Sequence, residues 1–248
     1  MNLVALGRTE STNTQAHRRA AAGAPHGTLL WAEEQTKGRG RQGREWISPP
    51  GNLYASLILR PKCDPTTATQ LAFVAALGVG DFLARYLEKT IPVHYKWPND
   101  VLVNGRKIAG ILAESTMGKA QDLAWVILGV GINVATHPEK VEWPATSLRA
   151  EGAEPPEIPE LVEKFGRSLL FCYNEWQEKG FPPIRKAWLE RAAGLGERIR
   201  VRASEATFEG TFTGLDEDGA LLVLKDGDKS PSRITSGDVF PMKILASL

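Results

Sequence analysis

The sequence predicts an α+β protein in which a mixed β-sheet is covered by helices and followed by a small β-barrel. Short β-favouring runs alternate with longer segments of helical periodicity up to residue 195. After Gly194-Leu195-Gly196 the pattern changes to short alternating runs separated by turn residues, which is typical of a small barrel. A chain of 248 residues is long enough for two unequal domains. We therefore predict one domain over residues 1–195 and a second over residues 196–248.

The elements of the first domain follow from local patterns. Ser11-Thr12-Asn13 precedes an Ala-rich stretch, and these side chains can accept hydrogen bonds from the first turn of a helix over residues 14–22. Apolar residues recur at helical spacing over residues 67–87, 158–173 and 183–193, which predicts three more helices. Strands are predicted at residues 28–32, 53–59, 94–97, 101–103, 108–114 and 124–128.

The second domain is predicted to contain only strands. These lie at residues 199–203, 207–213, 220–224 and 239–244, with a turn over residues 216–219. About fifty residues of short strands favour a barrel.

Composition excludes several classes of protein. The 30 Lys and Arg residues nearly balance 29 Asp and Glu residues, so we expect neither a nucleic-acid partner nor a membrane partner. Cys63 and Cys172 have no metal-ligand spacing, which argues against a zinc site and against a disulfide framework. Residues 1–10 lack the pattern of a secretory signal, and the most apolar stretches are shorter than the roughly 20 residues of a membrane span. A cytoplasmic location is expected.

Residues 38–44, Gly-Arg-Gly-Arg-Gln-Gly-Arg, form the most informative segment, which we name the glycine loop. Its glycines permit close backbone approach, and its guanidinium groups are planar donors for carboxylate and phosphate. The segment fits the spacing of a dinucleotide fingerprint, but no helix follows it, and it lacks the Gly-Lys-Ser/Thr ending of a P-loop. The sequence predicts an anion-binding loop, and a solvated basic loop stays open as the alternative.

Two further segments have a pattern of interest. Lys96-Trp97-Pro98-Asn99-Asp100 reads as a turn after a strand, and Lys107 begins an apolar strand that would carry its ammonium toward the sheet face. There it could neutralise a carboxylate and a phosphate, although most lysines at strand ends point into water. In Gly129-Val130-Gly131-Ile132-Asn133 the two glycines predict either a close ligand approach or a β-bulge.

Together these segments resemble the biotin protein ligase family. The resemblance covers the glycine loop with Gln35, Lys96 to Asp100, Arg106 to Leu112, the Gly-x-Gly-x-Asn strand, and Gly219-Ala220-Leu221-Leu222 near the C-terminus. Ser11-Thr12-Asn13 is similar to the family's N-terminal substrate-contact motif. The resemblance implies a biotin-lipoate ligase catalytic domain of the class II synthetase-like fold with an SH3-like C-terminal barrel.

The resemblance also implies an activity and a set of site residues. The enzyme would form biotinoyl-5′-AMP from biotin and ATP, with magnesium expected but without assignable ligands, and pass biotin to a lysine. Lys107 and Arg39 would be catalytic, and Arg44, Asn99, Asn133 and Trp143 would bind ATP or adenylate. The residues that would bind biotin are Ser11, Thr12, Asn13, Gln35, Gly38, Arg39, Gly40, Arg41, Lys107, Gly129 and Gly131.

Partners and alternatives complete the prediction. The acceptor would be the apo biotin carboxyl carrier domain of acetyl-CoA carboxylase or a related carboxylase, and homodimerisation stays open. The Ser-Thr-Asn motif begins at residue 11, so we expect no helix-turn-helix domain ahead of it and no repressor function. The alternatives are a lipoate or octanoate ligase or transferase, a catalytically silent biotin-binding regulator, and a general nucleotide-binding enzyme.

Overall fold

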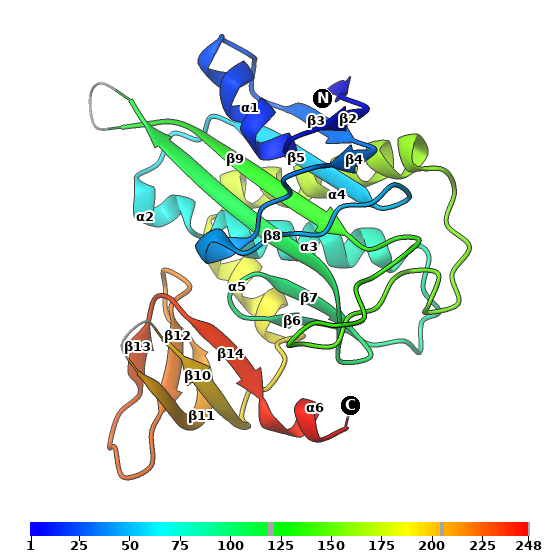
Figure 1. Ribbon diagram of the computed structural model, residues 1–248. Helices are drawn as coiled ribbons and strands as arrows, with labels where there is room; N and C mark the ends of the chain where they lie inside the picture. Colours follow the sequence, from blue (N-terminus) through cyan, green and yellow to red (C-terminus); the bar gives the residue numbers. More distant parts are fainter. Residues whose placement is uncertain (119–121, 204–205, 248) are drawn as a thin grey trace.

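A seven-stranded sheet forms the centre of the larger domain (Figure 1). The computed structural model describes residues 1–118, 122–203 and 206–247, and its strand order is β1-β3-β5-β9-β8-β7-β6. In this sheet β1 and β3 are parallel and the other neighbours are antiparallel. The strands are β1 (Asn2–Ala5), β3 (Thr28–Ala32), β5 (Leu53–Leu59), β6 (Val93–Lys96), β7 (Asp100–Val103), β8 (Arg106–Met117) and β9 (Leu123–Ile132), and β2 (Arg8–Thr9) pairs with β4 (Glu34–Gln35) beside them. The expected mixed sheet is confirmed.

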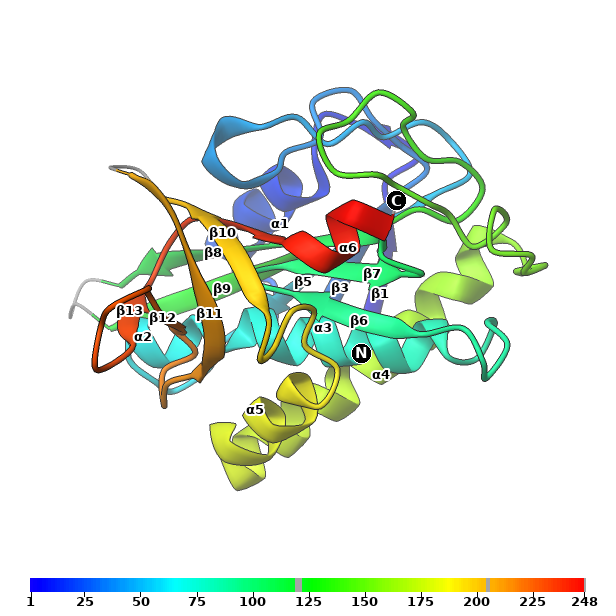
Figure 2. The ribbon, with the colours of Figure 1, turned by 90° about the horizontal axis from the view of Figure 1, so that it is seen from below.

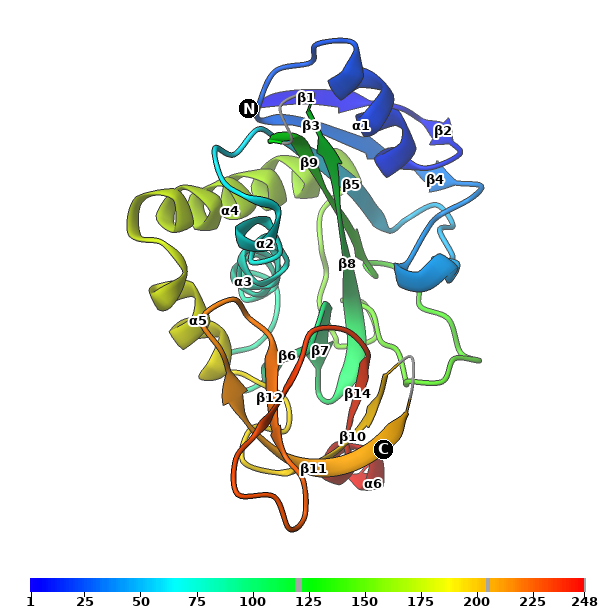
Figure 3. The same ribbon diagram turned by 90° about the vertical axis from the view of Figure 1, so that its left-hand side faces the viewer.

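Helices cover the two faces of this sheet unequally. Figure 3 shows α3 (Leu71–Leu83), α4 (Ile158–Lys179) and α5 (Phe181–Leu189) on one side and α1 (Thr12–Ala21) on the other. The alternation of side chains along each strand explains this division. On β5, Leu57 and Leu59 join the large core around α3, whereas Ile58 packs with Ala16 and Ala20 of α1.

One stretch of the described residues, Pro65–Leu83, passes a test for a membrane span by length and composition, with a mean hydropathy of 1.3. It consists of the short helix α2 (Pro65–Ala68) followed by α3, and 72% of it is buried inside the protein. Phe73 of α3 packs edge-on against Phe181 at 5.5 Å and against Trp188 at 5.3 Å between ring centroids. The stretch is therefore mostly a core segment, with α3 as its buried helix.

The start of α1 differs from expectation. The helix begins at Thr12, and Ser11 precedes it without any side-chain capping bond. Instead Gln35 Oε1 accepts from the Thr12 backbone N–H at 2.8 Å and from Thr12 Oγ1 at 3.0 Å. The predicted local cap is thus wrong, because a side chain from β4 satisfies this N–H group.

The C-terminal part forms a five-stranded antiparallel sheet in the order β13-β12-β11-β10-β14. Its strands are β10 (Arg198–Arg202), β11 (Thr207–Leu215), β12 (Leu221–Leu224), β13 (Ser232–Ile234) and β14 (Asp238–Pro241). The prediction of a strand up to residue 244 is wrong. The chain turns into helix α6 (Met242–Ser247) after Pro241, which lacks the N–H group that would continue the ladder.

Close contact between α3 and α4 depends on Gly78. A Cβ atom at this position would lie 3.0 Å from Leu169 Cα, which is backbone and cannot rotate away. We predict that Gly78→Ala lowers the free energy of unfolding by about 1–3 kcal/mol, because the helices must move apart. Gly166→Ala on α4 is the matched control: a Cβ atom there would meet the ends of two side chains, Met1 Sδ and Leu29 Cδ2, the latter at 2.8 Å. We expect a smaller cost than at Gly78, because side-chain ends can move aside and backbone cannot. Urea denaturation measures both, and equal losses would contradict the prediction.

Candidate active site

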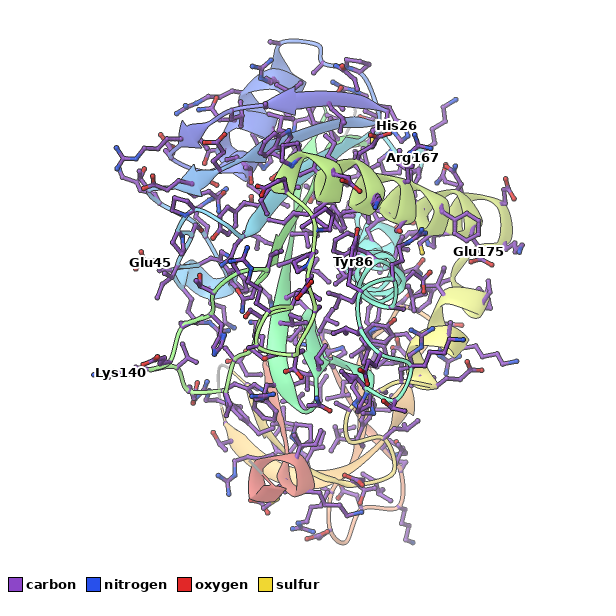
Figure 4. The ribbon with its side chains drawn as sticks, turned by 90° about the vertical axis from the view of Figure 1, so that its right-hand side faces the viewer. His26, Glu45, Tyr86, Lys140, Arg167 and Glu175 are labelled. Atoms are coloured by element: carbon purple, nitrogen blue, oxygen red, sulfur yellow. The ribbon has the colours of Figure 1, made fainter. Side chains whose placement is uncertain are left out.

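A cavity of about 280 Å³ opens on the α1 face of the large sheet. Strands β8 and β9 form its floor, and its walls come from the glycine loop, from residues 138–145 and from β14. In Figure 2 these two loop regions, blue and green, lie on the same side of the sheet, opposite α3 and α4. In Figure 4 Glu45 and Lys140 mark this loop side, whereas Tyr86 and Glu175 mark the helical side.

The floor of the cavity is backbone because three glycines face it. A Cβ atom at Gly129 would overlap the side-chain oxygen of Asn13, and one at Gly110 would lie 2.9 Å from the ring of Trp46. Gly131 lies under the same indole. The pairing of β9 with β5 and β8 is regular through Gly129 and Gly131, so the bulge interpretation is wrong. The glycines let side chains and ligands lie directly on the sheet.

A hydrogen-bond network fixes the polar end of the cavity. Ser56 Oγ contacts Thr12 Oγ1 at 2.8 Å and donates to Asn13 Oδ1 at 2.6 Å. Gln35 accepts from Thr12 and donates through Nε2 to Ser48 Oγ at 2.9 Å. Buried polar groups that are fully paired hold one orientation. Ser11, 2% exposed, lines the cavity beside these residues.

A buried carboxylate between two lysines forms the other end. Asp100 Oδ2 lies 2.8 Å from Lys96 Nζ, and Asp100 Oδ1 lies 2.5 Å from Lys107 Nζ. Burial raises the pKa of Asp100, but the charges of Lys107 and Lys96 outweigh burial and hold it well below its usual range. Lys107 is only 26% exposed in its side chain, and its ammonium also lies 5.3 Å from the ring centre of Trp46. Its head group therefore faces the cavity rather than open water.

The glycine loop directs its three arginines to three different partners. It contains a short 3₁₀ turn (Arg41–Gly43), in which Gln42 adopts a left-handed conformation with φ of 55°. Arg39 pairs with Glu114 at 2.7 Å and Arg44 pairs with Asp238 at 2.8 Å. Arg41 donates to Asn99 Oδ1 and to the Gly237 carbonyl, each at 3.3 Å. Burial lowers the pKa of Arg41, yet a guanidinium keeps its charge at neutral pH.

Gly38 is the one predicted biotin-site residue that does not line the main cavity. A Cβ atom there would overlap the Trp46 carbonyl and would lie 2.5 Å from Ser48 Oγ. The Gly38 carbonyl accepts from the Trp46 N–H at 3.0 Å. Gly38 thus lets the start of the glycine loop lie close against residues 46–48. Gly40, in contrast, lines the cavity.

The predicted nucleotide residues lie around the same cavity. Asn99 Nδ2 donates to the Ile111 carbonyl at 2.7 Å, and Asn133 Nδ2 donates to the Thr146 carbonyl at 2.9 Å. Trp143 is 8% exposed and donates to the Gly105 carbonyl at 3.0 Å. Lys96 lies 5.1 Å from the centre of its ring. The binding roles of these residues stay predictions.

The residues that the sequence did not predict include Trp46, Arg202 and Asp238, which line the cavity, and Glu114, which lies beside it. The indole N–H of Trp46 is buried without a hydrogen-bond partner among the described residues. Trp46 lies two residues after the glycine loop, so its place in the sequence could have marked it as a site residue. The partners of Arg202 and Asp238 come from distant segments, and no local pattern marks these two residues.

Magnesium was expected without assignable ligands. Within residues 1–118, 122–203 and 206–247 no group of three or more His, Cys, Asp or Glu side chains could hold a metal ion. Both oxygens of Asp100 already contact lysine ammonium groups. These residues do not form a magnesium cage of the protein's own.

Comparison with known proteins identifies the family. The family described as "Biotin/lipoate A/B protein ligase family" matches residues 5–133, and "Biotin protein ligase C terminal domain" matches residues 194–241. The biotin--[acetyl-CoA-carboxylase] ligase of Paracoccus denitrificans is 40% identical, covering 88% of this chain and 92% of that protein. The bifunctional ligase/repressor BirA of Bacillus subtilis is 35% identical, covering 92% of this chain and 70% of that protein.

A solved structure agrees with these relatives. The biotin protein ligase from Aquifex aeolicus in complex with biotin and ATP has a TM-score of 0.78 at 32% identity, covering 96% of this chain and 97% of that one. These matches define the class of protein, a ligase of the biotin and lipoate type with an added C-terminal domain. The chain belongs to the biotin protein ligase family, which confirms the resemblance seen in its motifs.

The buried carboxylate makes stability depend on pH. Asp100 has a folded-state pKa below its ordinary value of 3.8, so its ionised form stabilises the fold above that pH. This contribution is lost as the pH falls from 3.8 through the lower folded-state pKa. We predict that Asp100→Asn is less stable at neutral pH, because Lys96 and Lys107 lose their counter-ion, but that its stability falls less steeply in acid.

Urea unfolding from about pH 2.5 to pH 7 measures this difference. Asp228→Asn, at an exposed turn, is the control for removing one surface carboxylate. An acid slope of Asp100→Asn as steep as that of the wild type would show that this carboxyl does not titrate as described.

Proposed function

We propose that this chain activates biotin with ATP to biotinoyl-5′-AMP and then transfers biotin to a lysine of a carrier protein. The observation that carries this proposal is the meeting of Lys107, Arg39 and Arg41 around a cavity with a glycine floor. The Aquifex aeolicus relative, described in complex with biotin and ATP, supports the same pair of substrates.

The biotin end of the cavity offers both polar and apolar contacts. Thr12, Asn13 and Gln35 would hydrogen-bond the ring system, and Ser11 lies beside them. Gly129 and Gly131 would let the ring system lie close to the backbone. A mostly apolar cavity with a few fixed polar groups is typical of a specific small-molecule site.

Cations surround the place where the carboxylate and the α-phosphate would meet. Lys107, Arg39 and Arg41, with Gly40, line the cavity and would supply this charge, because charge stabilisation at a phosphoryl group is the main catalytic need of adenylation. Arg44, Asn99, Asn133 and Trp143 would hold the nucleotide beyond it. Gly38 would act indirectly, through the shape of the loop.

The chemistry then proceeds in two transfers. A biotin carboxylate oxygen attacks the α-phosphorus of ATP, the bond to the β-phosphate oxygen breaks, and pyrophosphate leaves. The ε-amine of the acceptor lysine next attacks the carbonyl carbon of the mixed anhydride. AMP leaves with the bonding electron pair, and the amine loses a proton as the amide forms. Positioning of the reacting groups supplies much of the rate.

We further propose the acceptor and the setting. The Paracoccus denitrificans and Mycobacterium tuberculosis relatives are named biotin--[acetyl-CoA-carboxylase] ligases, which supports a biotin carboxyl carrier domain as acceptor. Free thiols at Cys63 and Cys172 support a reducing, cytoplasmic location. The proposed division is 1–195 for catalysis and 196–248 for the barrel.

Exchange of labelled pyrophosphate into ATP tests adenylation directly. We expect exchange that depends on biotin and is reduced about 100-fold or more in Lys107→Ala, because one cation at the reacting phosphate is lost. Lys107→Arg is the second variant, since it keeps a charge beside Asp100 and so limits any loss of folding. Lys164→Ala, on the exposed surface of α4, is the control and should exchange like the wild type.

The alternatives give different results in this assay. Exchange that depends on lipoate or octanoate instead of biotin would identify a lipoate-type ligase. Biotin binding without any exchange would identify a silent biotin-binding regulator. Exchange by Lys107→Ala at the wild-type rate would contradict the proposed catalytic role of Lys107 but would leave the proposed adenylation standing.

We also propose that the chain has no DNA-binding repressor function, and the net charge of +1 supports this. The expected result is no saturable rise in fluorescence anisotropy of a labelled duplex, with or without biotin and ATP. Saturable binding that increases with biotin would contradict the proposal.

A further inference from the structure

Glu114 lies on β8 beside the cavity and contacts groups from two other segments. Its Oε2 atom accepts from Asn13 Nδ2 on α1 at 2.8 Å and from Arg39 Nη2 in the glycine loop at 2.7 Å. Asn13 and Arg39 both line the main cavity. Glu114 does not line it and borders the neighbouring hollow on the outer side of the loop. One carboxylate oxygen thus binds two cavity-lining side chains without lining the cavity itself.

Other contacts keep this carboxylate in place and ionised. His17 Nδ1 accepts from the Trp125 indole N–H at 3.2 Å, so the hydrogen of a neutral ring is on Nε2, which lies 3.6 Å from Glu114 Oε2. Burial raises the pKa of Glu114, but the hydrogen bonds from His17 and Asn13 and the charge of Arg39 outweigh it and lower the pKa. The carboxylate therefore keeps its charge at neutral pH.

The contact with Glu114 leaves most of Arg39 free to act. A guanidinium has five N–H donors in a planar fork, and the bond to Glu114 uses Nη2. The remaining donors are on a side chain that lines the cavity. Among the described residues, Glu114 provides the ion pair that connects Arg39 to the sheet. Without it, the loop would have to hold a long, 42% exposed side chain by itself.

We propose that Glu114 is a positioning residue, which holds Arg39 at the wall of the cavity and attaches the glycine loop to β8. The proposal rests on the proposed adenylation and adds a residue that touches neither substrate. Glu114 acts on the reaction through Arg39, because it is the charge of Glu114 that fixes the guanidinium.

Glu114→Gln removes this charge while leaving an oxygen that can accept from Asn13. Glu160→Gln, which removes an exposed carboxylate paired with Lys164 on α4, is the matched control. The first readout needs no activity: limited trypsin digestion without ligands, with cleavage after Arg41 and Arg44 followed by mass spectrometry. We expect Glu114→Gln to be cleaved about fivefold faster in the loop than the wild type, the effect of one half-exposed ion pair. Glu160→Gln should match the wild type.

The second readout is biotin-dependent pyrophosphate exchange in a double-mutant cycle with Arg39→Ala. We expect Glu114→Gln to lower kcat/KM for biotin about tenfold in the wild-type background and less than about twofold in the Arg39→Ala background. Thermal unfolding confirms that each variant is folded. Equal losses in both backgrounds would overturn the proposal, because a merely structural role would not depend on Arg39.

Failure of the proposed function looks different. If the wild type shows no biotin-dependent exchange, the adenylation proposal fails, and the digestion still decides whether Glu114 attaches the loop. If the wild type exchanges but Glu114→Gln is cleaved in the loop at the wild-type rate, the positioning proposal alone fails.

Discussion

The ion triad of Lys96, Asp100 and Lys107 is the constraint on which the site depends. Asp100 is 7% exposed, and burial of an unpaired carboxylate is costly, so both lysines must remain beside it. The triad connects β6, β7 and the first residues of β8 at the cavity wall. Lys107 is consequently placed by a buried counter-ion, and its long, flexible side chain loses much of its conformational freedom. The same contact that stabilises the fold therefore fixes the position of Lys107 at the cavity.

The sheet accommodates a ligand because alternation and glycine coincide. On β9, Leu128 and Val130 point into the large core while Gly129 and Gly131 face the cavity. The core face is thus filled with branched side chains, whereas on the opposite face the side chains of Asn13 and Trp46 lie directly against glycine backbone. A single added methyl group at Gly129 would meet Asn13, so the polar network and the bare floor depend on each other. The site is a surface that the strand pattern itself leaves open.

The sequence predicts well what local pattern determines. Thr28–Ala32 and Leu53–Leu59 were predicted to the residue, because both are short, mostly apolar β-favouring runs. β1 was not predicted, since it is mostly exposed and exists through its parallel pairing with β3. At the site the motifs indicated Lys107 and the glycines. The pair Arg39–Glu114 joins residues 75 positions apart in the sequence, and the pair Arg44–Asp238 joins residues 194 positions apart. No local sequence pattern predicts such contacts.

The barrel contributes side chains to the cavity, which argues against treating it as a passive appendage. Asp238 of β14 pairs with Arg44 of the glycine loop at 2.8 Å and with Arg202 of β10 at 3.1 Å. Arg202 in turn pairs with Glu142, in the loop that carries Trp143, at 2.6 Å. The barrel therefore contacts both loops that form walls of the cavity, the glycine loop and residues 138–145. Because exposed ion pairs contribute little one by one, such a link gains its strength from three joined pairs, two of which share the carboxylate of Asp238, 14% exposed in its side chain. A displacement of β14 would move both walls of the cavity together, so the geometry of this end of the cavity is a property of the two parts jointly.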